Sequence, residues 1–123
     1  IPQNEAQNLY DSSVPIWNMT GEYMIGVEVF HQLHCLDIIR KAAWPERYNH
    51  TFFFPNGTRD DFFTRHFGHC VENLRAAIIC HSDVTPVTFH WNRRMQSVVQ
   101  KLETPHKCRN FEKIRRWAGE RRV

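Results

Sequence analysis

The sequence lacks the features that place a chain across a membrane or mark it for export. No run reaches the 18 or so apolar residues that a membrane-spanning helix needs. No signal peptide, with its charged start and apolar centre, stands at Ile1. Any targeting or anchoring segment is therefore expected ahead of Ile1. No linker or change of composition divides the sequence, so residues 1–123 are predicted to form a single domain.

Little in the composition indicates a nucleic-acid partner. The net charge is only +3. The basic residues gather near the C-terminal end, without the alternation of basic and aromatic residues that known binding modules show. This basic run comprises Lys113, Arg115, Arg116, Arg121 and Arg122. We interpret it as the solvated face of a helix and predict no nucleic-acid partner.

Three familiar metal-site patterns are also missing. The paired-cysteine spacings of zinc fingers and the His-Glu-x-x-His motif of zinc proteases do not occur. A diiron carboxylate site needs Glu-x-x-His on two helices, and only Glu28 and His31 offer that spacing. These absences disfavour zinc fingers, zinc proteases and diiron enzymes.

What the sequence does contain is a duplicated histidine cassette. The pattern His-x-x-His-Cys, with an arginine five positions after the cysteine, occurs twice, displaced by 35 residues. Its members are His31, His34, Cys35 and Arg40, and then His66, His69, Cys70 and Arg75. On a helix each cassette presents two imidazoles and a thiol on one face. Two such helices packed together would place four imidazoles in one seam, as bundles with metal sites do.

We interpret the four cassette histidines as metal ligands and catalytic residues. Any one of them alone would be read as a partly buried histidine satisfied by hydrogen bonds, but two equivalent pairs are hard to explain by packing. Imidazole binds zinc, copper, iron and nickel. After the exclusions above, copper is the best candidate, as one or two ions, with molecular oxygen as the oxidant.

Three further residues could add ligands or act as an acid or a base: His81, His90 and Glu28. For His81 and His90, a surface or core role is the simpler explanation. His50 and His106 are expected in a loop and at the start of a helix.

Arg40 and Arg75 are expected to pair with Asp or Glu between helices, the alternative being an acidic group of a substrate. Asp83 is expected to end the second cassette helix through a local backbone hydrogen bond. Its alternative role is to orient a ligand histidine.

The four cysteines allow two pairings. Cys70 and Cys80 would lie about 15 Å apart on one helix, and a disulfide needs Cα atoms within about 7 Å. This leaves Cys35–Cys70 with Cys80–Cys108, or Cys35–Cys80 with Cys70–Cys108. We prefer the first, because a pseudo-twofold helix pair brings equivalent residues together near its axis. Alternatively, Cys35 and Cys70 remain thiolates and bind the metal, which favours electron transfer over oxygen activation.

Three glycosylation sequons begin at Asn18, Asn49 and Asn56. An even number of cysteines suits the same oxidising compartment, where disulfides persist. We therefore expect the protein in the lumen of the secretory pathway, either free or membrane-anchored with the catalytic domain on the luminal side.

The apolar periodicity and the helix signals predict a small, mainly α domain with two pseudo-equivalent metal-binding helices and disulfide staples. The expected order begins with an irregular lead-in over 1–20, a first cassette helix over 22–43 and a loop over 45–58. A second cassette helix then starts at a capping pair of Thr58 and Asp61 and ends near His81. An extended segment over 84–91 and a C-terminal helix, which starts at Thr104 and Pro105 and stops at Gly119, complete the chain. Residues 92–103 are ambiguous.

Four segments of the sequence resemble the UstYa-like family of fungal proteins of secondary metabolism. They are Phe30-His-Gln-Leu-His-Cys-Leu36, His66-Phe-Gly-His-Cys-Val-Glu-Asn-Leu-Arg75, Cys80-His-Ser-Asp-Val-Thr85, and Cys108-Arg-Asn-Phe followed by Ile114 and Trp117. The resemblance spans roughly residues 24–118. It implies a copper-dependent oxidase that cyclises, hydroxylates or halogenates a peptide or a peptide-derived natural product. It also implies a membrane helix ahead of the catalytic domain, which this sequence does not include.

The sequence thus supports an oxygen-dependent copper oxidase whose oxidised metal takes hydrogen from a bound peptide side chain, so that radical coupling follows. The alternative is a secreted or luminal binding module that a structural zinc ion stabilises, without catalysis. A homodimer or heterodimer half is a third interpretation.

Overall fold

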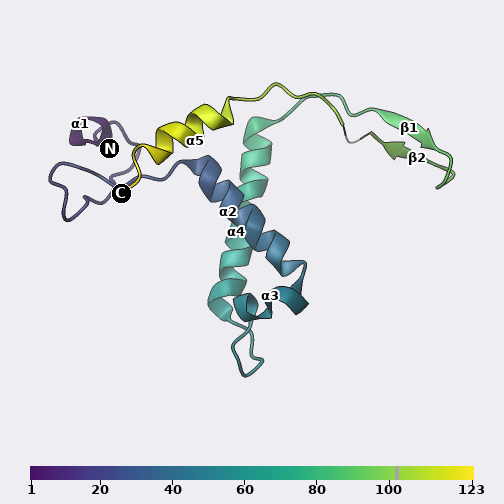
Figure 1. The fold of residues 1–123 in the computed structure, drawn as a ribbon, viewed down its shortest axis with the longest axis horizontal. Coiled ribbons are helices and arrows are strands. Elements are labelled where there is room, and N and C mark those ends of the chain that lie inside the picture. Colours follow the sequence, from purple (N-terminus) through teal and green to yellow (C-terminus); the bar gives the residue numbers. More distant parts are fainter. Residues whose placement is uncertain (102) are drawn as a thin grey trace. The chain divides into compact units, whose positions relative to one another are not determined.

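The computed structural model describes residues 1–101 and 103–123, without the side chains of residues 49–51. It divides into two compact units, residues 1–77 with Val123 and residues 78–122, and each is described by itself. In chain order the elements are α1 (Gln3–Ala6), α2 (Glu28–Ala42), α3 (Pro45–Phe52), α4 (Asp61–His81), β1 (Phe89–Asn92), β2 (Ser97–Gln100) and α5 (Phe111–Gly119) (Figure 1). The mainly α-helical class is confirmed.

The two cassettes lie on α2 and α4, which cross in the first unit (Figure 1). α4 has the extent that the sequence predicts, but its start is capped differently. The Oδ1 of Asp60 accepts hydrogen bonds from the backbone N–H of Phe62 at 2.8 Å and of Phe63 at 3.4 Å. Asp60 is therefore the capping residue, in place of the predicted pair of Thr58 and Asp61.

α2 begins six residues later than predicted, at Glu28 instead of residue 22. The preceding segment pairs with the N-terminal segment, through isolated antiparallel bridges of Glu22 with Pro2 and of Tyr23 with Pro15. Extended pairing uses the backbone groups that a helix would need, so the helix starts only after this segment ends. The lead-in itself contains one short helix, α1.

The predicted loop over 45–58 is wrong in its first half, which forms α3. Pro45 ends α2, as expected, but it also opens α3, because proline suits the first turn of a helix. α3 has a kink at Tyr48, where φ is −125° and ψ is 26°. Residues 53–60 form the turn that leads into α4, with Gly57 at a φ of +82°.

The second unit contains the end of α4, a hairpin and α5. β1 and β2 pair antiparallel, with His90 opposite Val99 and Trp91 opposite Val98. The extended segment expected over 84–91 is confirmed only at its end, and the ambiguous stretch 92–103 supplies the second strand, apart from Leu102, which lies outside the described residues. α5 begins at Phe111, not at Pro105, because the Oδ1 of Asn110 caps it, accepting from the backbone N–H of Lys113 at 2.9 Å.

The buried core of the described residues is small and centres on the crossing of α2 and α4. Cys35 and Cys70 are 0% exposed and Ile38 is 5% exposed. Half-buried side chains pack against this core: Phe52, Phe67 and Leu74. A core of this size supplies little hydrophobic stabilisation. Among the described residues, no helix is long and apolar enough to pass through a bilayer.

Candidate metal centre

The four cassette histidines come together where α2 crosses α4. The ring centroids of His31 and His69 are 5.4 Å apart, and those of His34 and His66 are 5.5 Å apart. Within α4, the rings of His66 and His69 stack at 6.4 Å. The closest pairs therefore join one imidazole from each helix.

The crossing has approximate twofold symmetry. A shift of 35 residues turns the pair His31 and His69 into the pair His66 and His34, and the two distances differ by only 0.1 Å (5.5 − 5.4). Because a step forward along α2 matches a step backward along α4, the helices run antiparallel. The sequence repeat is thus also a structural repeat.

Cys35 and Cys70 are equivalent positions and lie together in the core at this axis. Both are free thiols in the structure. Burial, and then the neighbouring thiol of Cys35, raise the pKa of Cys70 to about 12. This thiol is therefore protonated at neutral pH and shielded from solvent, which makes it a poor nucleophile.

Ring spacing decides which imidazoles can share an ion. A nitrogen that binds an ion at about 2 Å places its ring centre about 3.2 Å from the ion, so two rings on one ion are at most about 6.4 Å apart. Both cross-helix pairs lie well within this limit, whereas His66 and His69, at 6.4 Å, reach it only with the ion in line between them. Within the described residues, no set of three or more His, Cys, Asp or Glu side chains is arranged to hold one ion. The imidazoles thus form two pairs instead of one closed cage.

One ring nitrogen in this cluster is left unpaired by the residues that the structure describes. The Nδ1 atom of His66 is buried and has no hydrogen-bond partner among the described residues. A buried polar atom left unpaired is costly, and a bound cation would satisfy it. His34 and His69 are exposed, so the cluster is open to solvent and to a substrate. The residues present therefore fit a metal ion with free coordination positions.

Glu28 lies beside this cluster and connects the two helices. Its Oε1 accepts a hydrogen bond from the Nδ2 of Asn73 on α4 at 2.9 Å, and its Oε2 lies 3.6 Å from the Nδ1 of His31. The bond from Asn73 is the main reason that the pKa of Glu28 is lowered. Asn73 carries no signal in the sequence that would have identified it.

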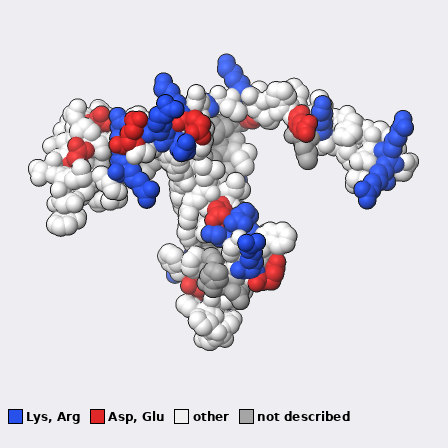
Figure 2. Space-filling model, viewed as in Figure 1, with Lys and Arg blue, Asp and Glu red and all other residues white. Residues whose placement is uncertain are grey.

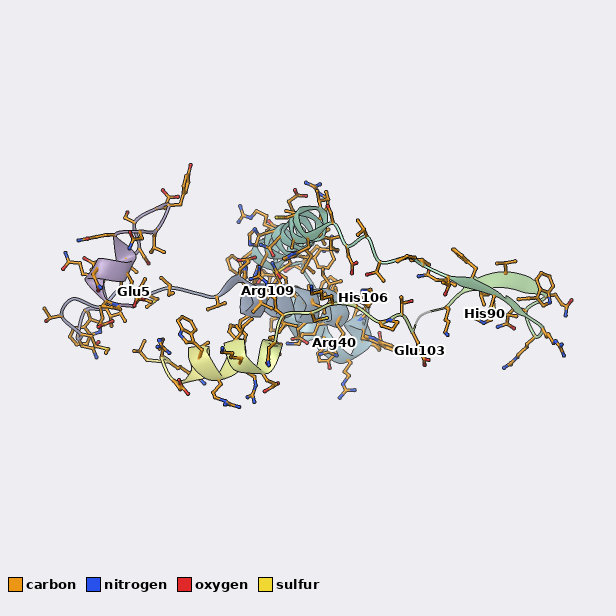
Figure 3. All side chains as sticks on the ribbon, turned by 90° about the horizontal axis from the view of Figure 1, so that it is seen from above. Glu5, Arg40, His90, Glu103, His106 and Arg109 are labelled. Atoms are coloured by element: carbon orange, nitrogen blue, oxygen red, sulfur yellow. The ribbon has the colours of Figure 1, made fainter. Side chains whose placement is uncertain are left out.

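His81 and His90, the other two candidate histidines, lie in the second unit. His81 is the last residue of α4 and His90 lies on β1, and both are exposed. Figure 3 shows His90 on the hairpin and His106 on the segment that leads to α5. The roles predicted for His81 and His90 as ligands, acids or bases stay predictions.

Arg40 and Arg75 do form ion pairs, but within their own helices and not between helices as predicted. The Nη2 of Arg40 lies 2.7 Å from the Oδ1 of Asp37, and the Nε of Arg75 donates to Glu72 at 2.8 Å. Each acid precedes its arginine by three residues, a spacing that brings side chains together on a helix. Arg40 also donates to the hydroxyl of Tyr48 on α3 at 3.3 Å.

Asp83 makes the local backbone bond that was predicted, but to the segment after α4. Its Oδ1 accepts from the backbone N–H of Thr85 at 2.9 Å, and its Oδ2 lies 2.7 Å from the Nδ1 of His106. The bonds from Thr85, and then the one from His106, lower the pKa of Asp83 to about 2. Sequence reasoning gave His106 no role, because its partner lies 23 residues away.

Cys80 and Cys108 are free and exposed in the structure, so the two disulfide staples stay predictions. Asn18 and Asn56 are exposed, as glycosylation requires. The Oδ1 of Asn56 accepts hydrogen bonds from the backbone and the hydroxyl of Thr58, at 3.0 and 2.6 Å. The side chain of Asn49 lies outside the described residues.

The basic C-terminal run lies on and just after α5, where Figure 2 shows Lys and Arg side chains gathered. All five of its members are exposed, as a solvated helix face requires. Arg115 pairs with Glu112 at 2.8 Å, and the guanidinium of Arg121 lies over the ring of Trp117 at 4.5 Å. These local contacts account for two of the basic side chains.

The fold and the site together define the class: this is a small helical protein in which two equivalent helices cross and pair four imidazoles in a cluster open to solvent. The chain belongs to the UstYa family, because the family described as "Mycotoxin biosynthesis protein UstYa" matches residues 1–121. No solved structure was found to match the chain.

Curated relatives carry the family's name. The chain is 36% identical over 100 residues to "UstYa family oxidase phomYc'" of Diaporthe leptostromiformis, covering 80% of this chain and 39% of the relative. It is 33% identical over 97 residues to "UstYa family oxidase VicYc" of Bipolaris victoriae (strain FI3), covering 79% and 90%.

One relative is named for another activity. The chain is 32% identical over 99 residues to "Transacylase cctO" of Talaromyces islandicus, covering 74% of this chain and 32% of the relative. The chain thus spans less than half the length of several relatives, although it spans most of VicYc.

Proposed function

We propose that this protein is a copper-dependent oxidase that acts on a peptide or a peptide-derived natural product in fungal secondary metabolism. Oxidative cyclisation is the main reaction proposed, with hydroxylation or halogenation as variants. The observation that carries the proposal is the pairing of four imidazoles across α2 and α4, at 5.4 and 5.5 Å. Oxidase names among the relatives support it, and we place the reaction in the lumen of the secretory pathway, as the sequons suggest.

The four histidines would both hold the copper and leave it accessible to a substrate. His31 with His69, and His34 with His66, would each hold copper, and the exposed members of the two pairs leave room for substrate. When bound, copper supplies the one-electron chemistry with dioxygen by which hydrogen is withdrawn from the substrate. The buried core at Cys35 and Cys70 keeps the two helices in register, so that the imidazoles stay in reach of one another.

Acyl transfer, the activity in the name of one relative, finds less support at this site. A transacylase with a cysteine nucleophile needs an accessible thiolate, and the cassette cysteines are 0% exposed. A purely structural zinc ion is the stronger alternative, because the small core would benefit from a metal. Zinc at the imidazole pairs would stabilise the fold without any reaction with dioxygen.

Metal loading followed by oxygen uptake separates these functions. Metal-free protein is incubated with Cu(II) or Zn(II), freed of unbound ions, and given ascorbate as the reductant in an oxygen electrode. We expect retained copper and dioxygen uptake by the native chain, and a loss of both in His69→Ala. His106→Ala is the matched control, because His106 is also exposed but pairs with Asp83 and is not a candidate ligand. Retention of zinc but not copper, with unfolding on chelation, would instead support the structural module.

A further inference from the structure

The two imidazole pairs match in spacing but not in their surroundings. The shift of 35 residues that exchanges the pairs maps Glu28 onto Phe63, and Asn73 onto Ile38. The polar pair of residues beside His31 therefore has an apolar counterpart beside His66. Sequence repetition created four equivalent ligands, while the residues next to them differ.

On the polar side, a carboxylate faces the imidazole. The Oε2 of Glu28 lies 3.6 Å from the Nδ1 of His31, which is within ion-pair range. The other carboxylate oxygen accepts from Asn73 at 2.9 Å and from Gln32 at 3.5 Å. One of these bonds comes from α4 and the other from the next turn of α2, so Glu28 is held from both helices.

On the apolar side, aromatic rings surround the imidazole. The ring centroid of Phe63 lies 6.3 Å from that of His66, and the centroid of Phe62 lies 5.9 Å from it. Phe63 also meets Phe52 edge-on at 6.2 Å. The Nδ1 of His66 is buried without a hydrogen-bond partner among the described residues. Among the described residues, no carboxylate contacts His66. The position equivalent to Glu28 on this side of the crossing is Phe63.

We propose that Glu28 is a positioning residue for His31, and that the hydrogen bond between Glu28 and Asn73 makes the pair of His31 and His69 the tighter of two unequal copper sites. This inference rests on the proposed function. A carboxylate beside Nδ1 keeps the proton on that nitrogen, so the lone pair of Nε2 is free for the ion and the ring is held in place. The negative charge also attracts the cation. His66 receives neither effect, because its unpaired Nδ1 is itself the nitrogen that a cation would satisfy, and no carboxylate contacts its ring among the described residues.

The first test needs no metal. In metal-free protein, at a pH where the imidazoles are neutral, long-range proton–nitrogen NMR spectra report which nitrogen of each histidine carries the proton. We expect His31 to carry it on Nδ1 in the native chain and to shift toward Nε2 in Glu28→Gln. Glutamine keeps the oxygen that Asn73 binds, so the helix crossing is retained. A native His31 protonated on Nε2, or an unchanged spectrum in the variant, would overturn the proposal.

The second test is a Cu(II) titration followed by calorimetry and electron paramagnetic resonance. The native chain should bind one equivalent more tightly than the next. Glu28→Gln should weaken that first equivalent by about 10-fold or more and change its spectrum, and Glu28→Asp should restore part of the affinity. The matched control is Glu72→Gln, because Glu72 also lies on a cassette helix but is bound to Arg75.

The outcomes separate the two proposals. Copper binding by the native chain with no effect of Glu28→Gln, or with an equal effect of Glu72→Gln, refutes the role of Glu28 and leaves the oxidase proposal standing. A native chain that binds no copper refutes both the oxidase proposal and the unequal sites.

Discussion

Replacement of Cys70 by serine tests whether the helix crossing is the core of the first unit. Cys70 is 0% exposed and lies with Cys35 and Ile38 in the small buried cluster. A serine hydroxyl there would be desolvated beside a thiol and apolar groups, which costs about 1–3 kcal/mol when no good partner exists. We expect Cys70→Ser to lower the free energy of unfolding by about 2 kcal/mol, a large share of the 5–15 kcal/mol typical of folded domains.

The assay is urea unfolding of metal-free, reduced protein, followed by circular dichroism. With a slope of about 2 kcal/mol per molar urea, the midpoint should fall by about 1 M. Cys80→Ser is the control, since Cys80 is exposed and surface changes usually stay within about 0.5 kcal/mol. Equal midpoints for the two variants would refute the reasoning, because the crossing of α2 and α4 would then not be the core.

Four other predictions follow from particular contacts. A disulfide between Cys35 and Cys70 would close a loop of about 35 residues and should stabilise the protein by about 4 kcal/mol. The measurement is the fall in the urea midpoint when reductant is added to the oxidised Cys80→Ser, Cys108→Ser variant. Asp83, whose pKa is lowered from 3.8 to about 2, should contribute stability that is complete above about pH 4 and lost as the pH falls through about 2. His106→Ala should raise the pKa of Asp83 in an NMR titration. Asn110→Ala should remove the cap of α5 at a cost of about 1 kcal/mol, visible as lost helicity, and unchanged helicity would contradict the capping role.

The cassette helices could be predicted from the sequence because their signals are local and repeated. The spacing of histidine, histidine and cysteine placed each set on one helical face, and the exact repeat implied the twofold crossing that the ring distances show. The class of fold and the extent of α4 followed from the same periodicity. Local patterns of this kind depend on residues at most four positions apart.

The errors arose where a residue has more than one structural use. Pro45 both ends one helix and opens the next, and residues 22–24 pair with the N-terminal segment before α2 can begin. Helix α5 starts at Phe111, because Asn110 caps it, and not after the predicted start at Thr104 and Pro105. These choices depend on which backbone groups find partners, which a short window does not reveal.

Contacts between distant residues were the least predictable part of the site. The bond from Asn73 to Glu28 spans 45 residues, and the pair of Asp83 and His106 spans 23. Glu28 itself was a candidate because of its spacing to His31, but nothing near it in the sequence named its partner. Such pairs follow from helix packing and chain direction, so they require the structure.

The central claim is that the paired imidazoles hold copper. Its most direct test is pulsed electron paramagnetic resonance of the Cu(II)-loaded chain, with the copper content measured on the same sample. We expect bound copper with nitrogen couplings from imidazole, lost together with the copper when His31, His34, His66 and His69 are all replaced by alanine. Equal copper content and equal nitrogen couplings in the native and the fourfold variant would contradict the account.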